Sequence, residues 1–146
     1  MDTIRRAWDR TLRFARLLGA EKVLFQCPPS FQPTSRNKDR MRRFFGGIER
    51  EGIVCLWEPR GRWERADVAA LCRERGLVHA VDPLKGRPVG RGLRYWRPHG
   101  TGGYRHTHTD EELRRLAVML GGRPAYVLFN NVAMFDDARR FASLLP

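Results

Sequence analysis

The sequence predicts an α/β fold of parallel β/α units with about five strands. Short apolar runs that end abruptly in polar groups recur along the chain, which is typical of strands buried in a parallel sheet. Segments with apolar residues at helical spacing separate these runs. The runs occupy residues 24–31, 53–60, 77–83, 93–100 and 125–131. A chain of 146 residues is expected to form a single domain over 1–146.

The first helix is expected to begin at a Thr3 cap and to end at Gly19. Its predicted apolar face consists of Ile4, Trp8, Leu12 and Ala15, widened by Phe14, Leu17 and Leu18. The first strand is predicted over 22–26, because the two prolines at 28 and 29 lack the N–H that a strand ladder needs. A polar loop over 32–38 then leads to a second helix, whose apolar stripe is Met41, Phe44, Phe45 and Ile48.

The middle of the chain predicts three further strands and one helix. A strand over 53–58 is followed by a helix over about 66–75, with Gly76 as its stop signal. The next strand covers 77–82, and a loop rich in proline, glycine and basic residues covers 83–92. A strand over 93–97 then follows.

The last part begins with a glycine-rich loop around 100–103. Thr109 and Glu112 stand three residues apart, which predicts a capping box at a helix start. The buried face of that helix is expected to hold Leu113, Leu116, Ala117 and Leu120. A strand over 125–129 and a helix over 134–145 complete the chain.

Two folds satisfy this alternation of helices and strands. One is an open doubly wound sheet, and the other is part of an eight-stranded β/α barrel. Five strands are too few to close a normal eight-stranded barrel.

The net charge of +12 comes almost entirely from arginine, since Lys22, Lys38 and Lys85 are the only lysines. One interpretation is a polyanionic partner, in the first place a nucleic acid, because arginine pairs with phosphate through a planar fork of donors. The other is an arginine-rich protein of a thermophile with many surface ion pairs. The arginines are spread along the chain rather than gathered in one tract, which weakens the first interpretation.

Three cysteines, an odd number, suit a reducing cytoplasm, and the cytoplasm is the expected location. Cys55 and Cys72 fall inside predicted elements, whereas Cys27 at a strand end is a candidate reactive thiol. No apolar run approaches the length of a membrane span, so no membrane association is expected.

Polar side chains follow the predicted strands, where parallel strands would bring them to one edge of the sheet. Glu58, Asp82 and His99 are the candidate catalytic residues, because carboxylates and an imidazole can serve as general acid and base. The candidate substrate-binding residues are Gln26, Arg60, Arg97, Tyr104, Arg105, Asn130 and Asn131. The alternative for the charged groups is a layer of salt bridges that closes the top of a barrel.

The histidines raise a weaker possibility. His106 and His108 are two residues apart and would face the same side of an extended loop. With His99 they are candidate ligands of zinc or a similar divalent metal, although solvated loop histidines are the simpler interpretation. No metal site is therefore assigned, and a divalent metal stays only a candidate cofactor. Phe31 and Trp63, in loops at the same edge, are candidates for stacking on a base or sugar.

Six segments at the strand ends resemble a known family, the TIM-barrel family called domain of unknown function 72, or YecE-like. They are residues 24–31 (LFQCPPSF), 58–60 (EPR), 81–83 (VDP), 95–100 (YWRPHG), 103–105 with 109–113 (GYR and TDEEL), and 126–131 (YVLFNN). Their order is that of the family, and the end of the chain is similar to the family's archaeal branch. The resemblance implies a TIM-barrel fold and no settled activity.

The chain departs from the family at its beginning. Family members start with a strand that carries a Gly-Thr-Ser-Gly-Trp-like motif, and this chain has none. The resemblance therefore implies the C-terminal half of a TIM barrel. Such a half-barrel would expose two strand edges and an apolar sheet face. A second chain is expected to complete it, either a separately encoded N-terminal half or a second copy; a self-sufficient open sheet is the alternative.

Three functions remain open at this point. The first is a hydrolase, of phosphodiesterase or nuclease type, acting on a phosphate-bearing substrate such as a nucleic acid. The second is a non-catalytic nucleic-acid-binding protein. The third is a structural half of a two-chain barrel.

Overall fold

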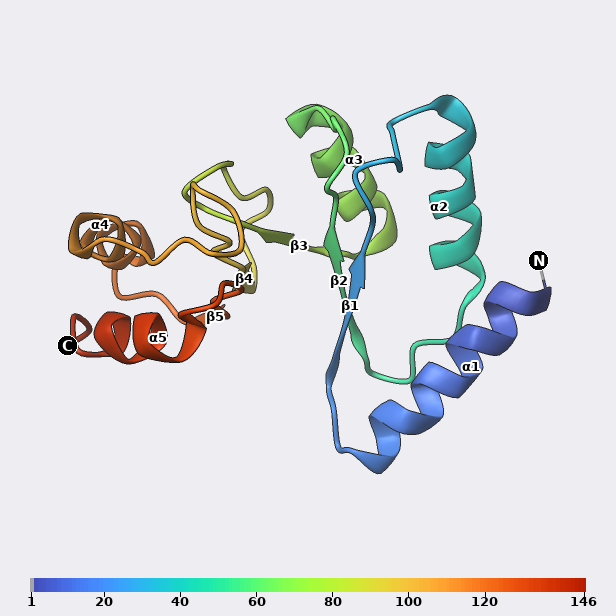
Figure 1. Cartoon of the computed structure of the whole chain (residues 1–146). Helices are drawn as coiled ribbons and strands as arrows, with labels where there is room; N and C mark the ends of the chain where they lie inside the picture. The colour runs from blue at the N-terminus through green and yellow to red at the C-terminus, as the bar shows by residue number, and fades with distance from the viewer. Residues whose placement is uncertain (1) are drawn as a thin grey trace. The chain divides into compact units, whose positions relative to one another are not determined.

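The computed structural model describes residues 2–146, although it leaves the side chain of Asp2 undescribed. Within this range five strands form one sheet in the order β1-β2-β3-β4-β5, and every neighbouring pair is parallel. The helices and strands alternate along the chain (Figure 1). The predicted α/β fold with parallel β/α units and five strands is therefore confirmed.

The chain divides into two compact units, of which the first ends at His79 and the second begins at Ala80. The first half of β3 (Val78–Val81) pairs with β2, and its second half pairs with β4. The pairings of β1 and β2 therefore lie in the first unit, and those of β4 and β5 lie in the second.

The first unit contains α1 (Asp2–Leu17), β1 (Lys22–Gln26), α2 (Ser35–Gly47), β2 (Val54–Glu58) and α3 (Arg65–Arg75). The ring of Phe25 in β1 contacts Trp8 of α1 and both Phe44 and Phe45 of α2. One side chain thus packs against two helices, so α1 and α2 cover the same face of the strands, as Figure 1 shows. The register places Phe25 beside Trp57, which is fully buried.

The second unit contains β4 (Arg94–Trp96), α4 (Asp110–Leu120), β5 (Ala125–Val127) and α5 (Met134–Ala142). Helices α4 and α5 lie side by side (Figure 1). Its core is a continuous apolar cluster of Trp96, Leu113, Leu116, Leu120, Phe129 and Phe141. The predicted buried positions of the capped helix are thus in this core, with Ala117 packed against it.

Two helix starts differ from the sequence prediction. The predicted polar loop over 32–38 already contains the first turn of α2, which begins at Ser35. Thr34 is the reason, because its hydroxyl accepts a hydrogen bond from the backbone N–H of Asn37 and caps the helix. The predicted cap Thr3 lies instead inside α1.

The apolar face of α1 is narrower than predicted. Trp8, Leu12 and Ala15 are buried, whereas the other predicted face residues are exposed, namely Ile4, Phe14, Leu17 and Leu18. The strands β3, β4 and β5 are also shorter than the apolar runs that predicted them. In the described part of the chain, every helix is too short or too polar to cross a lipid bilayer.

Candidate functional site at the carboxyl ends of the strands

The ends of three neighbouring strands meet at His99 in the second unit. Asp82 follows β3, His99 follows β4, and Asn130 follows β5. One carboxylate oxygen of Asp82 accepts a hydrogen bond from the backbone N–H of His99 at 3.0 Å. The side-chain amide nitrogen of Asn130 lies 3.0 Å from Nδ1 of His99. Three of the predicted site residues therefore lie together at this edge.

Asp82 holds the backbone of His99, and Asn130 holds its ring. With the Asn130 amide donating, Nδ1 of a neutral His99 is an acceptor and the ring proton lies on Nε2. The second oxygen of Asp82 accepts from the backbone N–H of Leu84 at 3.0 Å, and Lys85 lies 3.9 Å from the carboxylate. Because backbone groups occupy both oxygens, this geometry favours a positioning role for Asp82 over the predicted acid–base role.

The loop after His99 is tied to the end of β5. The backbone N–H of Val132 donates to the carbonyl oxygen of Tyr104, and the Asn131 amide donates to that of His106, both at 2.7 Å. The side chains of Tyr104 and Arg105 remain exposed on this loop. Asn131, predicted to contact substrate, is fully buried and holds the loop in place.

A buried network lies behind this edge and centres on Asp137 of α5. Nδ1 of His108 lies 2.8 Å from Oδ2 of Asp137, and both side chains are completely buried. The same oxygen accepts from the Asn131 amide at 2.7 Å, and Oδ1 accepts from Arg140 at 3.0 Å. Burial acts to raise the pKa of Asp137, but the hydrogen bonds from the His108 backbone, the His108 ring and Asn131 outweigh it and lower that pKa.

His106 has a different carboxylate partner. Its Nε2 lies 2.8 Å from Oε2 of Glu112, which also accepts from the backbone N–H of Thr109. The capping box predicted for Thr109 and Glu112 is thereby confirmed. Burial acts to raise the pKa of Glu112, but the hydrogen bonds from His106 and Thr109 lower it on balance.

The three histidines considered as metal ligands each contact a side chain of the protein. His99 contacts Asn130, His106 contacts Glu112, and His108 contacts Asp137. Among residues 2–146 no three histidine, cysteine, aspartate or glutamate side chains are grouped as a metal site requires.

The remaining predicted site residues belong to the first unit, except for Arg97. Gln26 and Glu58 are register partners at the ends of β1 and β2, where Gln26 is exposed and Glu58 is buried. Arg60 is exposed just beyond. Arg97 is half-buried in the second unit, and its backbone N–H continues the β3–β4 pairing by donating to Val81. The joint action of Glu58 with Asp82 and His99 stays a prediction.

Comparison with known proteins gives the fold. No known protein family and no curated protein sequence matches the chain. Two crystal structures of a DUF72 family protein from Enterococcus faecalis do match, one with a TM-score of 0.68 at 16% identity and the other with 0.60 at 18%. The chain therefore has the DUF72 fold. The matches cover 90% and 89% of this chain and 62% of each chain compared, so it spans less than two thirds of the proteins it matches.

Within the DUF72 fold, the family-like segments of the sequence mostly lie where the strands end. The Phe-Gln-Cys-Pro-Pro segment leaves β1, Glu-Pro-Arg leaves β2, and Tyr-Trp-Arg-Pro-His-Gly leaves β4. This placement agrees with the sequence prediction that polar groups collect at the carboxyl ends of parallel strands.

Sequence reasoning missed Asp137, although it is the most heavily bonded carboxylate of the second unit. A signal was present, because Asp137 precedes the buried Phe141 by four residues and so lies on the same face of α5. A carboxylate on the apolar face of a helix needs buried partners. Those partners are His108 and Asn131.

Two aromatic residues predicted to stack on a ligand also stack on each other. The rings of Phe31 and Trp63 are 5.8 Å apart and nearly parallel, and the Trp63 indole donates to the carbonyl oxygen of Phe31 at 2.8 Å. The ring faces that these two residues turn toward each other are therefore not available to a ligand.

Proposed function

We propose that this chain is a YecE-like member of the DUF72 family, of the archaeal type, and that it corresponds to the C-terminal half of the TIM barrel. The DUF72 fold of the chain supports this proposal, as do the six family-like segments that occur in the family's order. The share of the matching chains that it covers agrees with a partial barrel.

The function we propose is hydrolysis of a phosphate-bearing substrate, with a nucleic acid as the first candidate. One observation carries the proposal: at the ends of three adjacent parallel strands, Asp82 holds the backbone of His99 and Asn130 holds its ring. Active sites of β/α barrels lie at this edge, and an oriented histidine is the commonest general acid and base.

In this reaction water attacks phosphorus and the bond to the leaving oxygen breaks. His99, whose ring proton lies on Nε2, supplies that proton to the leaving oxygen, and the proton released by the attacking water restores it. Arg97, two residues earlier, is the candidate for pairing with the phosphate oxygens. Asn130 holds the ring through Nδ1 and so leaves proton transfer to Nε2.

The test measures turnover of bis(p-nitrophenyl) phosphate and of labelled single- and double-stranded RNA and DNA, with and without Mg²⁺ or Mn²⁺. We expect His99→Asn to lower turnover about 100-fold or more, and Glu58→Gln and Asn130→Ala to lower it less. Arg115→Gln, an exposed change on α4, is the matched control and should leave turnover unchanged. Equal cleavage by the wild type and His99→Asn would reject the proposal.

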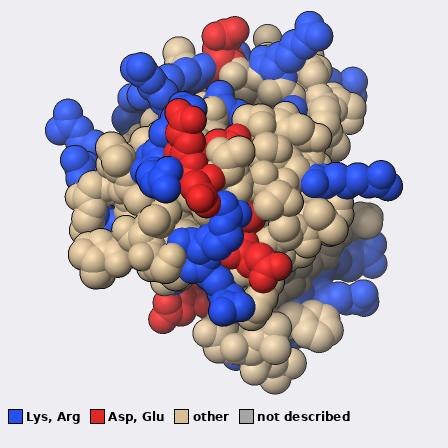
Figure 2. All heavy atoms as spheres, turned by 60° about the vertical axis from the view of Figure 1, so that its left-hand side comes forward, with Lys and Arg blue, Asp and Glu red and all other residues tan. Residues whose placement is uncertain are grey.

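A second candidate is non-catalytic nucleic-acid binding, which the excess of 28 basic over 16 acidic residues favours. Lys and Arg side chains project around the face seen in Figure 2, where Asp and Glu side chains are fewer. Such binding depends on release of counterions from phosphate, so its affinity should fall about tenfold or more between 50 and 200 mM salt. Binding of a labelled 20-mer that does not change with salt would contradict it.

A third candidate is a structural role in a two-chain barrel, favoured by an exposed apolar surface around the edge strand β5. Tyr126, Leu128, Val132 and Phe135 are exposed there by 45%, 41%, 60% and 73%. An unpaired strand edge beside apolar side chains is suited to pairing with another polypeptide. The partner is a separately encoded N-terminal half or a second copy of this chain.

Light scattering during size-exclusion chromatography tests the second copy. A measured mass twice that of one chain would support a dimer, provided that Leu128→Lys lowers the mass to that of a monomer. Val118→Lys on α4 is the control, because Val118 is also exposed, by 80%, and this change should leave the dimer intact. A monomer that keeps its fold alone and co-purifies with no stoichiometric companion from its source would reject both partners.

A further inference from the structure

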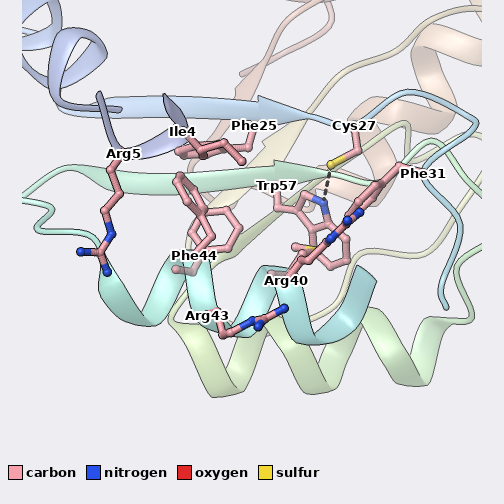
Figure 3. Close-up of a pocket in the computed structure, with 11 residues that line it drawn as sticks. Ile4, Arg5, Phe25, Cys27, Phe31, Arg40, Arg43, Phe44 and Trp57 are labelled. Carbon is pink, nitrogen blue, oxygen red and sulfur yellow. Dashed lines mark hydrogen bonds between the residues drawn. The ribbon is translucent and has the colours of Figure 1, made fainter. Parts of the chain in front are cut away.

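A pocket of about 580 Å³ lies in the first unit, and neither the proposed hydrolysis nor the other candidates use it. Figure 3 shows it between the strands β1 and β2 and the helices α1 and α2. The rings of Phe25, Phe44 and Trp57 form much of its wall. Its volume falls in the range of about 300–1,000 Å³ found for small-molecule sites, and its walls are mainly apolar, as such sites are.

Three arginines, Arg5 of α1 and Arg40 and Arg43 of α2, line the same pocket. Arg5 and Arg40 stand on either side of the ring cluster in Figure 3. No ion pair joins any of the three to an acidic side chain that the structure describes. Their neighbour Arg42, which does not line the pocket, bonds instead to Glu74 at 2.8 Å.

This combination specifies a ligand. An apolar, ring-lined pocket favours a flat apolar body through dispersion and ring stacking. Guanidinium groups without acidic partners at its edge favour a phosphate or carboxylate, with which arginine forms paired hydrogen bonds. A purely apolar protein segment would fill the ring-lined part but would leave the arginines desolvated without an anion, which is costly.

We propose that this pocket binds an amphipathic anion: an apolar body of one or two rings that carries a phosphate or carboxylate. The body lies against Phe25 and Phe44, and the anionic group pairs with Arg40 and Arg43. The inference does not rest on the proposed hydrolysis, because every residue it uses lies in the first unit.

Cys27 supplies an internal reporter of occupancy. It lines the pocket, and its Sγ accepts a hydrogen bond from the indole N–H of Trp57 at 3.4 Å (Figure 3). Cys27 is half-buried, whereas Cys55 and Cys72 are buried, so alkylation should occur first at Cys27. A ligand that fills the pocket should also slow alkylation of Cys27.

The experiment titrates the full chain with 1-naphthyl phosphate, 1-naphthoate and the neutral 1-naphthol by calorimetry. We expect both anions to bind in the micromolar to millimolar range and 1-naphthol at least about tenfold more weakly. The two anions separate a phosphate preference from a carboxylate preference. Arg40→Met and Arg43→Met should each weaken anion binding about tenfold.

Arg36→Met is the matched control, because Arg36 is an exposed arginine of α2 that does not line the pocket. It should bind both anions as the wild type does. Phe44→Ala should weaken the anions and 1-naphthol alike, and each variant is first checked for a cooperative thermal transition. The proposal is overturned if 1-naphthol binds as tightly as the anions, if Arg36→Met weakens binding as much as Arg40→Met, or if saturating 1-naphthyl phosphate leaves Cys27 alkylation unchanged.

Discussion

Nδ1 of His108 lies 2.8 Å from Oδ2 of Asp137, and both side chains are completely shielded from solvent. The oxygen also accepts from the His108 backbone and from Asn131, so the carboxylate is ionised and Nδ1 carries the ring proton. The pair joins the loop before α4 to α5. It therefore supports the same loop that leads away from His99.

Replacement of Asp137 by asparagine should destabilise the protein strongly. The amide cannot accept all the hydrogen bonds that the carboxylate accepts, and it leaves buried donors without partners. We expect a loss of about 3 kcal/mol in the free energy of unfolding, measured by urea titration. Asp136→Asn, at the exposed neighbouring position, is the control and should change stability little. Equal stability of the two variants would show that the network does not contribute.

Acidification between pH 7 and pH 5 should destabilise the protein through His79. Burial, followed by the nearby charge of Arg65, lowers the pKa of His79 to about 4, against an opposing effect of Glu58. The unfolded chain, with an ordinary histidine pKa near 6.5, therefore binds the proton first as pH falls, and stability decreases. The expected loss from this one group is about 2 kcal/mol over that range.

The comparison that isolates this effect is between the wild type and His79→Gln. Asp137 and Glu112 have lowered pKa values, so the stability they contribute is lost only as pH falls further, into their own range. Urea titrations at pH 7, 6 and 5 should give a difference between the two proteins that changes with pH. A constant difference would contradict the lowered pKa of His79.

Thr109→Ala should remove one half of the capping box of α4. The Thr109 hydroxyl accepts from the backbone N–H of Glu112, and alanine leaves that N–H without its partner. The expected cost is about 1 kcal/mol in unfolding free energy. Thr107→Ala, an exposed change two residues earlier, serves as the reference and should cost much less.

Gly100→Ala should disturb the loop that follows His99. Gly100 has a φ of +79°, and an added Cβ would lie 2.5 Å from Cβ of His106. Alanine is strained at this φ and would also push the His106 side chain away from Glu112. We expect a loss of about 2 kcal/mol in thermal or urea unfolding. Gly92→Ala, with open space around the glycine and no positive φ, should be nearly neutral.

Cys27 should be a slow nucleophile rather than a reactive thiol. Burial raises its pKa, and the hydrogen bond from Trp57 offsets this only in part. Alkylation by iodoacetamide at pH 7 should therefore be several times slower than that of a small free thiol and should accelerate above pH 9. Cys27→Ser should abolish the early phase of labelling. A rate equal to that of a free thiol would reject the shift.

Much of the fold could be predicted because its signals are local. Thr109 and Glu112, within four residues, predict the start of α4. Gly76 adopts the left-handed conformation and ends α3 as predicted. The start of α2 was missed because the polar residues around Thr34 suit a loop as well as a capped helix start. The width of the α1 face was overestimated because periodicity shows which residues share a face, but not how much of that face a neighbour covers.

The candidate site was predictable only in its ingredients. Parallel strands imply that Asp82, His99 and Asn130 gather at one edge, and the structure joins them by hydrogen bonds. The sequence could not predict which atoms form these hydrogen bonds. Asp82 binds the backbone of His99, whereas Asn130 binds its ring.

The alternation of strands and helices, their approximate limits and the polar strand ends follow from residue order, because backbone periodicity and capping depend on neighbours within a few positions. The pairing of His108 with Asp137, 29 residues apart, came from folding alone. So did the ring-lined pocket with its three arginines, which brings together residues from α1, β1, α2 and β2. Such contacts depend on how elements pack in three dimensions, and no spacing along the chain encodes which faces will meet.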